Sequence, residues 1–324
     1  MELLKVQDLS IQYMTKEGAF LALDKVSISI QKGCSLGVVG ESGCGKTTLG
    51  MGIMGLLPEN ASVCHGEILF EGRDILKFNQ KEMRRYRWKD VSMIFQSAMN
   101  SLNPVKRVGD QIKEVILAHE PHMSKQELQD RVEALFRLVN LPVERLRDYP
   151  HQYSGGMRQR AVIAMALALN PKLVIADEAT TALDVIIQDQ ILKETKILQR
   201  DFGLSILFIS HDIAVVFDVS DDIAVMYAGQ VVEIGRKHQI LKNPAHPYTK
   251  ALLSSYPKLG LEKERLRPIP GDPKKSLVYG NTCRFMDRCP EVDRQCKANP
   301  PQWIELEEGH KIFCKGTAHA IANS

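Results

Sequence analysis

Residues 40–47 read Gly-Glu-Ser-Gly-Cys-Gly-Lys-Thr and fit the pattern G-x-x-x-x-G-K-[ST]. Glycines at this spacing let backbone N–H groups converge on phosphate oxygens, and a helix that follows adds its positive N-terminal end. The Lys46 ammonium can reach β- and γ-phosphates, and the Thr47 hydroxyl can ligate Mg²⁺. A merely structural glycine turn is disfavoured, because the motif lies between a predicted strand and a predicted helix. The residues expected to contact a nucleotide here are Gly40, Ser42, Gly43, Cys44, Gly45, Lys46, Thr47 and Thr48.

Two carboxylates follow an apolar strand predicted at residues 173–176. Asp177 is expected to hold Mg²⁺ through water, and Glu178 is expected to polarise the water that attacks a γ-phosphate. Acidic residues also gather at helix N-termini for electrostatic reasons alone. Because the phosphate loop lies upstream, the pair here indicates ATP hydrolysis.

The segments around these motifs alternate between strand-like and helix-like patterns. This alternation predicts an α/β fold with a mostly parallel sheet, and an antiparallel strand pair is added near the N-terminus. The expected strands lie at 6–13, 26–30, 36–39, 68–70, 91–95, 173–176, 206–209, 224–227 and 231–233, the last two forming a hairpin. The expected helices lie at 47–57, ended by Pro58, within 108–169, including 128–139 ended by Pro142, and at about 185–200. The basic run at 81–89 is interpreted as a solvated helix face.

The composition is that of an ordinary globular protein. The 324 residues are 44% hydrophobic and 25% charged, and the formal net charge of +3 is too small and scattered to indicate a nucleic-acid partner. No apolar run approaches the roughly 18 residues that a membrane-spanning helix needs. The N-terminus lacks the basic and apolar zones of a signal peptide, so we expect the protein to stay in the cytosol and to reach a membrane only through another protein.

Residues 153–160, Tyr-Ser-Gly-Gly-Met-Arg-Gln-Arg, resemble the signature sequence of ABC-type ATPases. Other motifs follow in the order found in that family. Gln96 is placed like the family's Q-loop glutamine, and residues 182–184, Ala-Leu-Asp, are placed like its D-loop. His211 is placed like its switch histidine, and Tyr13 like an aromatic residue that stacks on adenine.

The resemblance covers about residues 1–255 and implies a P-loop NTPase core, an antiparallel β subdomain and a helical signature subdomain at about 97–169. It implies a head-to-tail dimer in which each ATP lies between the phosphate loop of one subunit and the signature of the other. Exposed N–H groups at the start of the signature helix could bind the γ-phosphate of the ATP held by the other subunit. The residues that would meet the γ-phosphate are Ser154, Gly155 and Gly156 from the neighbour, together with His211 and with Gln96, which would also reach Mg²⁺. With this set present, a non-enzymatic interaction module is disfavoured.

Three further segments resemble the ATPases of oligopeptide and dipeptide importers: Asn-Pro at 103–104, Pro-His-Gln at 150–152 and Asn-Pro-Ala-His-Pro-Tyr-Thr at 243–249. The resemblance implies an ATP-hydrolysing motor, peripheral on the cytoplasmic face of the inner membrane, that drives uptake of dipeptides or oligopeptides. Nickel or another small solute is the alternative cargo. Its partners would be a second ATPase subunit (a paralogue, or an identical copy), two transmembrane permease subunits and, indirectly, an external solute-binding protein. Ala179 stands where the family usually has proline, so a looser turn is expected there without loss of chemistry.

Four cysteines crowd the C-terminal region, where an extension rich in proline and charge is expected over 256–324: Cys283, Cys289, Cys296 and Cys314. Their spacing, C-x5-C-x6-C-x17-C, is wider than the cysteine pairs of most structural zinc sites, whereas iron–sulfur clusters accept wider spacings. The residues alone leave zinc, a cluster and free thiols open. The similarity to the extension of peptide-importer ATPases, which includes Arg-Cys-Pro at 288–290, implies a 4Fe–4S cluster. Such a group would staple an extension too small to fold on its own core.

Cys44 lies inside the phosphate loop, at the expected start of a helix. Backbone N–H groups there can lower the pKa of a thiol and make it reactive. A small filler residue with ordinary reactivity is the other interpretation, and both stay open.

Overall fold

The computed structural model describes residues 1–96, 101–179, 184–255, 269, 271 and 282–315. The chain divides into two compact units, each with its own internal packing. The first unit comprises Met1, Gln31–Cys34 and Lys77–Phe208, and the second comprises Glu2–Ile30, Ser35–Leu76 and Ile209–Ser324. The boundary predicted near residue 256 falls inside the second unit.

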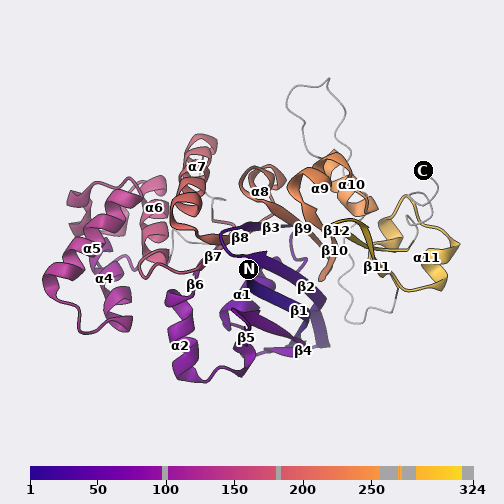
Figure 1. Cartoon of the computed structure of the whole chain (residues 1–324), viewed down its shortest axis with the longest axis horizontal. Helices are drawn as coiled ribbons and strands as arrows, with labels where there is room; N and C mark the ends of the chain where they lie inside the picture. The colour runs from indigo at the N-terminus through magenta and orange to yellow at the C-terminus, as the bar shows by residue number, and fades with distance from the viewer. Residues whose placement is uncertain (97–100, 180–183, 256–268, 270, 272–281, 316–324) are drawn as a thin grey trace. The chain divides into compact units, whose positions relative to one another are not determined.

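An antiparallel sheet in the second unit has the strand order β2-β1-β4-β5 (Figure 1). β1 (Glu2–Thr15) and β2 (Gly18–Gln31) confirm the predicted strand pair and are longer than the apolar alternation indicated. β4 (Ala61–Phe70) pairs antiparallel with β1, and the short β5 (Arg73–Asp74) follows it. Alternate side chains of β1, such as Leu9 and Ile11, are fully buried, which fixes the register of the sheet.

The second unit also contains five strands in the order β11-β12-β10-β9-β3. β3 (Ser35–Val39) runs parallel to β9 (Asp222–Tyr227), which forms the predicted hairpin with β10 (Gln230–Arg236). β12 (His310–Cys314) then pairs antiparallel with β10 and with β11 (Gln302–Glu307). The described part of the C-terminal extension therefore continues this sheet, which the sequence did not predict. The other helices of this unit are α8 (Ile213–Val219), α9 (Lys237–Lys242), α10 (Pro247–Ser254), α11 (Arg294–Ala298) and the 3₁₀ turn Met286–Arg288.

Helix α1 (Lys46–Met54) starts at the end of the phosphate loop. The prediction that it runs to residue 57 and stops at Pro58 is wrong. Gly55 has a φ of 60°, and its N–H bonds back to the carbonyl of Gly52, so the helix is capped earlier. A glycine in the left-handed region ends a helix without the steric cost that other residues meet there.

The first unit contains three buried strands in the order β8-β7-β6. The last two residues of β8, Ile209 and Ser210, belong to the second unit. β7 (Leu173–Asp177) is parallel to β6 (Val91–Ile94), and β8 (Ser205–Ser210) is the third. All three confirm predicted strands. The helices are α2 (Gln80–Lys89), α4 (Val108–His119), α5 (Lys125–Leu138), α6 (Gly155–Ala166) and α7 (Val185–Phe202), with 3₁₀ turns at Val143–Arg147 and Pro150–Gln152, while the 3₁₀ turn Ile75–Lys77 lies at the unit boundary.

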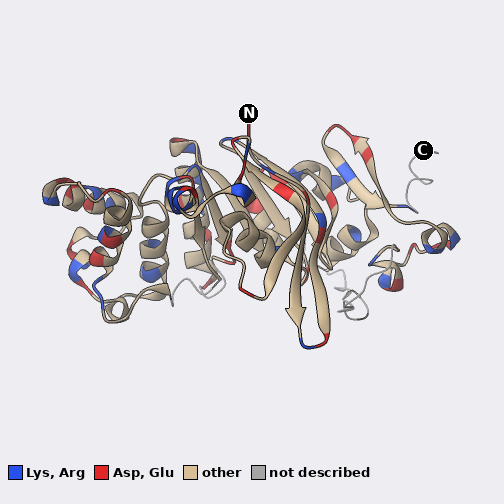
Figure 2. Ribbon diagram, turned by 90° about the horizontal axis from the view of Figure 1, so that it is seen from below, with Lys and Arg blue, Asp and Glu red and all other residues tan. Residues whose placement is uncertain are grey.

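Acidic and basic residues are interspersed along the helices and strands of the described chain, as Figure 2 shows. Residues 81–86 confirm the predicted charged helix, whereas the backbone is not helical at Arg87 and Trp88. The basic side chains of α2 are exposed or half-buried, and only Tyr86 is buried. No helix among the described residues has the length and apolar character needed to span a membrane.

A buried carboxylate ties together three parts of the second unit. Glu233 on β10 accepts hydrogen bonds from the backbone N–H groups of Ala245 and His246, both at 2.9 Å, and its Oε1 lies 2.8 Å from Nε2 of His310 on β12. Burial alone would raise the pKa of Glu233, but its hydrogen bonds, that with His310 first, bring the pKa below the usual value. The bond to Glu233 raises the pKa of His310, so the two side chains form a buried ion pair.

We predict that Glu233→Gln lowers the free energy of unfolding by about 3 kcal/mol, because one partner of a buried ion pair is removed. The pair contributes most between the unfolded-state pKa of glutamate, 4.5, and that of histidine, 6.5. Below this window Glu233 becomes protonated, and above it the contribution fades as the pH rises through the folded-state pKa of His310. Urea unfolding of both proteins between about pH 5 and about pH 9, a range that brackets the histidine pKa, measures the difference in their free energies of unfolding.

Glu308→Gln is the matched control, because this glutamate is exposed and lies between β11 and β12, the strand that carries His310. Its unfolding curve should match that of the unsubstituted protein. Equal stability of Glu233→Gln and Glu308→Gln would contradict the ion-pair interpretation.

Candidate functional site

The phosphate loop lies in the second unit, between β3 and α1. Gly43 and Gly45 have φ values of 78° and 104°, in the left-handed region that favours glycine. A Cβ atom on Gly40 would lie only 2.1 Å from the carbonyl oxygen of Met226. The loop therefore needs glycine at these positions, both for backbone conformation and for the close approach of β9.

Lys46, the predicted phosphate-binding lysine, is only 6% exposed. Its ammonium donates to the carbonyl oxygens of Gly40 at 2.8 Å and of Glu41 at 3.0 Å, so the loop itself holds the side chain in place. Of the two threonines that follow, Thr47 is exposed and Thr48 is half-buried. Ser42 is exposed on the loop, as a residue that contacts phosphate must be.

Tyr13, the predicted adenine-stacking residue, lies on β1 next to the start of α1. Its hydroxyl is 3.3 Å from Oγ1 of Thr48, and its ring is half-buried. His211, the predicted switch histidine, follows β8 directly and is exposed. The second unit thus carries the phosphate loop, Tyr13 and His211.

Cys44 does not have the environment that a reactive thiol needs. It is 4% exposed, and burial raises its pKa even though Lys46 opposes that shift. The hypothesis of a reactive Cys44 is therefore wrong, because burial outweighs the backbone N–H groups on which that hypothesis relied. The interpretation of Cys44 as a small filler residue agrees with its position in the core.

The acidic pair lies in the first unit, at the carboxyl end of β7. Asp177 is 1% exposed, and Glu178 follows with a φ of 49°, a left-handed conformation that is costly for a residue other than glycine. The amide of Gln96 donates to Oε2 of Glu178 at 2.6 Å. The structure therefore brings together the predicted Q-loop glutamine and the predicted catalytic glutamate. The sequence named both residues but gave no sign of their contact.

The signature segment lies in the first unit at the start of α6. Ser154 caps this helix by accepting a hydrogen bond from the N–H of Met157 at 3.3 Å. Gly155 and Gly156 form the first turn, and a Cβ on Gly156 would lie 2.9 Å from the Ile187 side chain of α7. The glycines thus allow close packing of α6 on α7 and leave the helix N-terminus uncovered by larger side chains.

Helix α7 begins immediately after the predicted D-loop. Asp184 caps it by accepting from the N–H of Ile187 at 3.0 Å, whereas residues 182 and 183 lie outside the described residues. The next two side chains, Val185 and Ile186, are 80% and 79% exposed. Such exposed apolar side chains beside the signature helix are typical of a surface that another molecule covers.

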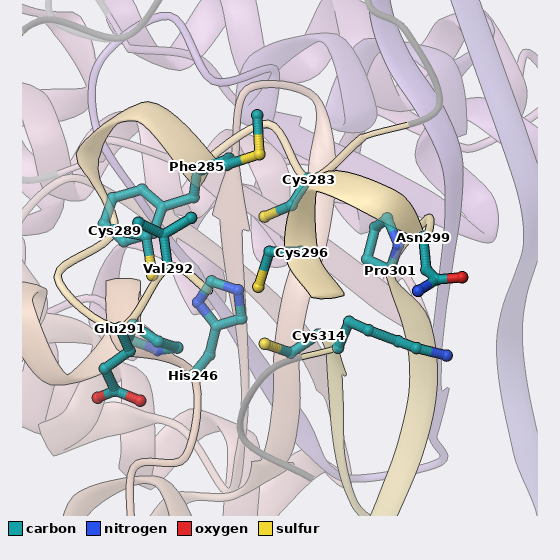
Figure 3. Close-up of a pocket in the computed structure, with 13 residues that line it drawn as sticks. His246, Cys283, Phe285, Cys289, Glu291, Val292, Cys296, Asn299, Pro301 and Cys314 are labelled. Atoms are coloured by element: carbon teal, nitrogen blue, oxygen red, sulfur yellow. The ribbon is translucent and has the colours of Figure 1, made fainter. Parts of the chain in front are cut away.

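The four C-terminal cysteines, Cys283, Cys289, Cys296 and Cys314, line one pocket of the second unit (Figure 3). The buried His246 ring lines the same pocket, and burial lowers the pKa of His246 to about 4. Burial, followed by the charges of neighbouring cysteines, raises the pKa of Cys283 and of Cys289 to about 11. Among the described residues no three His, Cys, Asp or Glu side chains are grouped so that they could hold a metal ion. The structure thus confirms that the cysteines are neighbours and leaves their ligand a matter for proposal.

The chain matches two family models. Residues 23–181 match the model for the ABC transporter, and residues 232–296 match the model for the C-terminal region of the oligopeptide/dipeptide transporter. The dipeptide transport ATP-binding protein DppD of Bacillus subtilis is 46% identical over 97% of this chain and 94% of its own length. The oligopeptide transport ATP-binding protein OppD of Escherichia coli is 42% identical over 92% of this chain and 89% of its own length.

Solved structures show the same fold. The dimeric structure of MJ0796, described as a bacterial ABC transporter cassette, has a TM-score of 0.65 and 26% identity, over 72% of this chain and 98% of that chain. The structure of cbiO1 from Clostridium perfringens has a TM-score of 0.66 and 26% identity, over 75% of this chain and 91% of that chain. These likenesses confirm the ABC cassette fold and its ATPase activity. The chain therefore belongs to the family of dipeptide and oligopeptide transport ATP-binding proteins.

Proposed function

We propose that this chain is the ATP-hydrolysing motor of an importer for dipeptides or oligopeptides. The observation that carries the proposal is the hydrogen bond between Gln96 and Glu178, which joins a residue able to sense the γ-phosphate to the residue that prepares the attacking water. Support for peptides as cargo comes from the names of the relatives and from the C-terminal family model. Nickel or another small solute is the alternative cargo.

The proposed chemistry is transfer of the γ-phosphoryl group to water, achieved by positioning and electrostatics. Lys46 and the N-terminus of α1 bind the phosphates, and Thr47, Gln96 and Asp177 would hold Mg²⁺. Mg²⁺, when bound, neutralises charge that develops on the phosphate oxygens. Glu178 orients and polarises the water, and its hydrogen bond to Gln96 fixes one carboxylate oxygen so that the other can face the water.

We further propose that hydrolysis takes place in a head-to-tail dimer, as the resemblance to ABC-type ATPases implies. The N-terminus of α6, with Ser154, Gly155 and Gly156, would meet the γ-phosphate held by the neighbouring subunit. The exposed Val185 and Ile186 beside it supply an apolar surface that such a neighbour would cover. The second subunit would be a paralogue or an identical copy. Two transmembrane permease subunits would hold the pair at the cytoplasmic face of the inner membrane, with an external solute-binding protein acting through them.

For the cysteine pocket we propose a 4Fe–4S cluster, with zinc as the alternative. Support for a metal group comes from the shared pocket, which all four cysteines line, because thiolates are the ligands of both iron–sulfur clusters and structural zinc. The wide spacing of the cysteines along the chain favours the cluster. Nδ1 of His246 accepts from the N–H of Tyr248 at 3.0 Å, which places the ring proton on Nε2, where it can donate to a group in the pocket. A bound cluster would cross-link Cys283 and Cys289, which pack against the core around Tyr248, to Cys314 in the smaller core around Ile312.

We predict that Glu178→Gln lowers the ATP turnover rate by at least about 100-fold, the usual contribution of a general base. MgATP binding should be retained, because the phosphate loop is untouched, and the ATP-bound dimer should persist. Steady-state phosphate release and size-exclusion chromatography with the partner ATPase subunit measure both effects. Glu144→Gln, an exposed substitution in the first unit, is the control and should leave turnover unchanged. Substantial hydrolysis by Glu178→Gln would contradict the proposed role of Glu178.

The cargo is tested by uptake of a radiolabelled dipeptide and of radiolabelled nickel into cells that make the whole transporter. Uptake of the dipeptide should depend on an intact Glu178, whereas nickel uptake should not. The reverse pattern would favour the alternative cargo.

Protein purified without oxygen should show a broad absorption band at about 400 nm, as expected for cysteine-bound iron–sulfur clusters. Chemical analysis of the same protein should find iron and sulfide in equal amounts. Cys296→Ser should lose this band, because one of the buried ligands is removed. A colourless protein that carries one zinc ion per chain would overturn the cluster and favour zinc.

A further inference from the structure

The cysteine pocket and the phosphate loop are joined by a side-chain contact within the second unit. Arg288, next to Cys289, donates from Nη1 to Oε2 of Glu41 at 2.8 Å and from Nη2 to Oε1 at 2.9 Å. Glu41 is the second residue of the phosphate loop, 247 positions away in the sequence. The segment that carries the cysteines therefore reaches directly into the nucleotide-binding loop.

This contact differs from an ordinary surface ion pair, which contributes little. The Arg288 side chain is only 7% exposed, and Glu41 is 25% exposed. The guanidinium lies over the ring of Tyr227, 5.7 Å from its centroid, and it also donates to the Tyr227 hydroxyl at 3.2 Å. A two-pronged bond from a buried, stacked guanidinium fixes the position of a carboxylate as well as its charge.

The backbone of Glu41 is held at the same time as its side chain. Its N–H donates to the hydroxyl of Tyr248 at 3.0 Å, and its carbonyl oxygen accepts from Lys46 at 3.0 Å. The conformation of the loop at Glu41, and with it the position of the Lys46 ammonium, thus depends on residues from the C-terminal half of the chain.

A second arginine of the same segment acts on the other side of the loop. Arg284 donates to the carbonyl oxygen of Ala228 and to Oδ2 of Asp24, the latter at 2.6 Å. It thereby supports the β9–β10 turn, in which the N–H of Gly229 donates to the carbonyl oxygen of Cys44 at 2.9 Å. Two independent contacts therefore connect residues 283–289 with the phosphate loop.

The negative charge of Glu41 determines whether loss of Arg288 strengthens or weakens nucleotide binding. An unpaired Glu41 carboxylate would repel the anionic phosphates that the loop must receive, and this repulsion is strong in a partly buried site. The guanidinium of Arg288 neutralises that carboxylate. Without Arg288 the loop would lose both its fixed geometry and its charge balance, and either loss weakens nucleotide binding.

We propose that Arg288 is a positioning residue for the phosphate loop and couples the cysteine-bearing segment to nucleotide binding. The inference rests on the proposed function, because it assumes that this loop binds ATP. Coupling between two sites is reciprocal, so bound ATP must in turn stabilise residues 283–289.

The test is the dissociation constant of a fluorescent ATP analogue, measured on the full-length protein as purified and without Mg²⁺ so that hydrolysis does not interfere. Arg288→Gln is expected to raise this constant about 10-fold, within the usual range of coupling between sites. Arg288→Lys keeps the charge but not the two-pronged bond and should raise it by a smaller factor, about 3-fold. Arg294→Gln, an exposed arginine on α11 in the same extension, is the control and should leave it unchanged.

A double substitution separates positioning from a general loss of structure. In a Glu41→Gln background, Arg288→Gln should change the dissociation constant by less than about 2-fold, because its partner carboxylate is already gone. An equally large effect in both backgrounds, or no effect in either, overturns the inference. Failure of the unsubstituted protein to bind the analogue would instead refute the proposed function.

The reciprocal effect gives a second readout. In the unsubstituted protein, added ATP should slow amide hydrogen exchange in residues 283–289, and Arg288→Gln should lose this slowing. Exchange that is indifferent to ATP in the unsubstituted protein would overturn the coupling even if the binding constants behave as expected.

Discussion

A nucleotide's phosphates carry concentrated negative charge, and a protein can bind them in water only if its positive ends are fixed in advance. In this chain the fixed groups are the N–H groups of a loop whose glycines adopt left-handed conformations and whose lysine is held by the carbonyl oxygens of Gly40 and Glu41. Strand β3 ends just before this loop, and helix α1 begins at Lys46, so both elements fix the ends of the loop.

The strands next to this loop were predictable from sequence, because the apolar residues of β1 alternate and those of β3 form a short continuous run, and both patterns are typical of strands. The end of α1 was not, since a proline was taken as the stop while a capping glycine lay nearer. β11 was also missed: its apolar face, Ile304 and Leu306, is only half-buried, and Trp303 beside it is 41% exposed. β12 was missed too, although alternate residues of it are buried, because two of these are His310 and Cys314 rather than aliphatic residues.

The motifs named Lys46, Gln96 and Glu178 as candidate site residues, and the structure brings Gln96 and Glu178 into contact. The pKa of Cys44, in contrast, depends on burial that the motif does not encode. The contact between Arg288 and Glu41 joins residues far apart along the chain, and no spacing rule links them. The left-handed φ of Glu178 likewise shows a strained backbone at the glutamate proposed to act on water, where the sequence suggested only a looser turn.

The pairing of β12 with β10 limits how far the chain can be shortened. A version ending after α10 would keep every nucleotide-binding motif, yet it would uncover a row of unpaired N–H and C=O groups along β10. An open edge of that kind invites another strand to add to it, in the way that aggregates grow. The C-terminal hairpin therefore covers an edge of the sheet that a shortened chain would leave open.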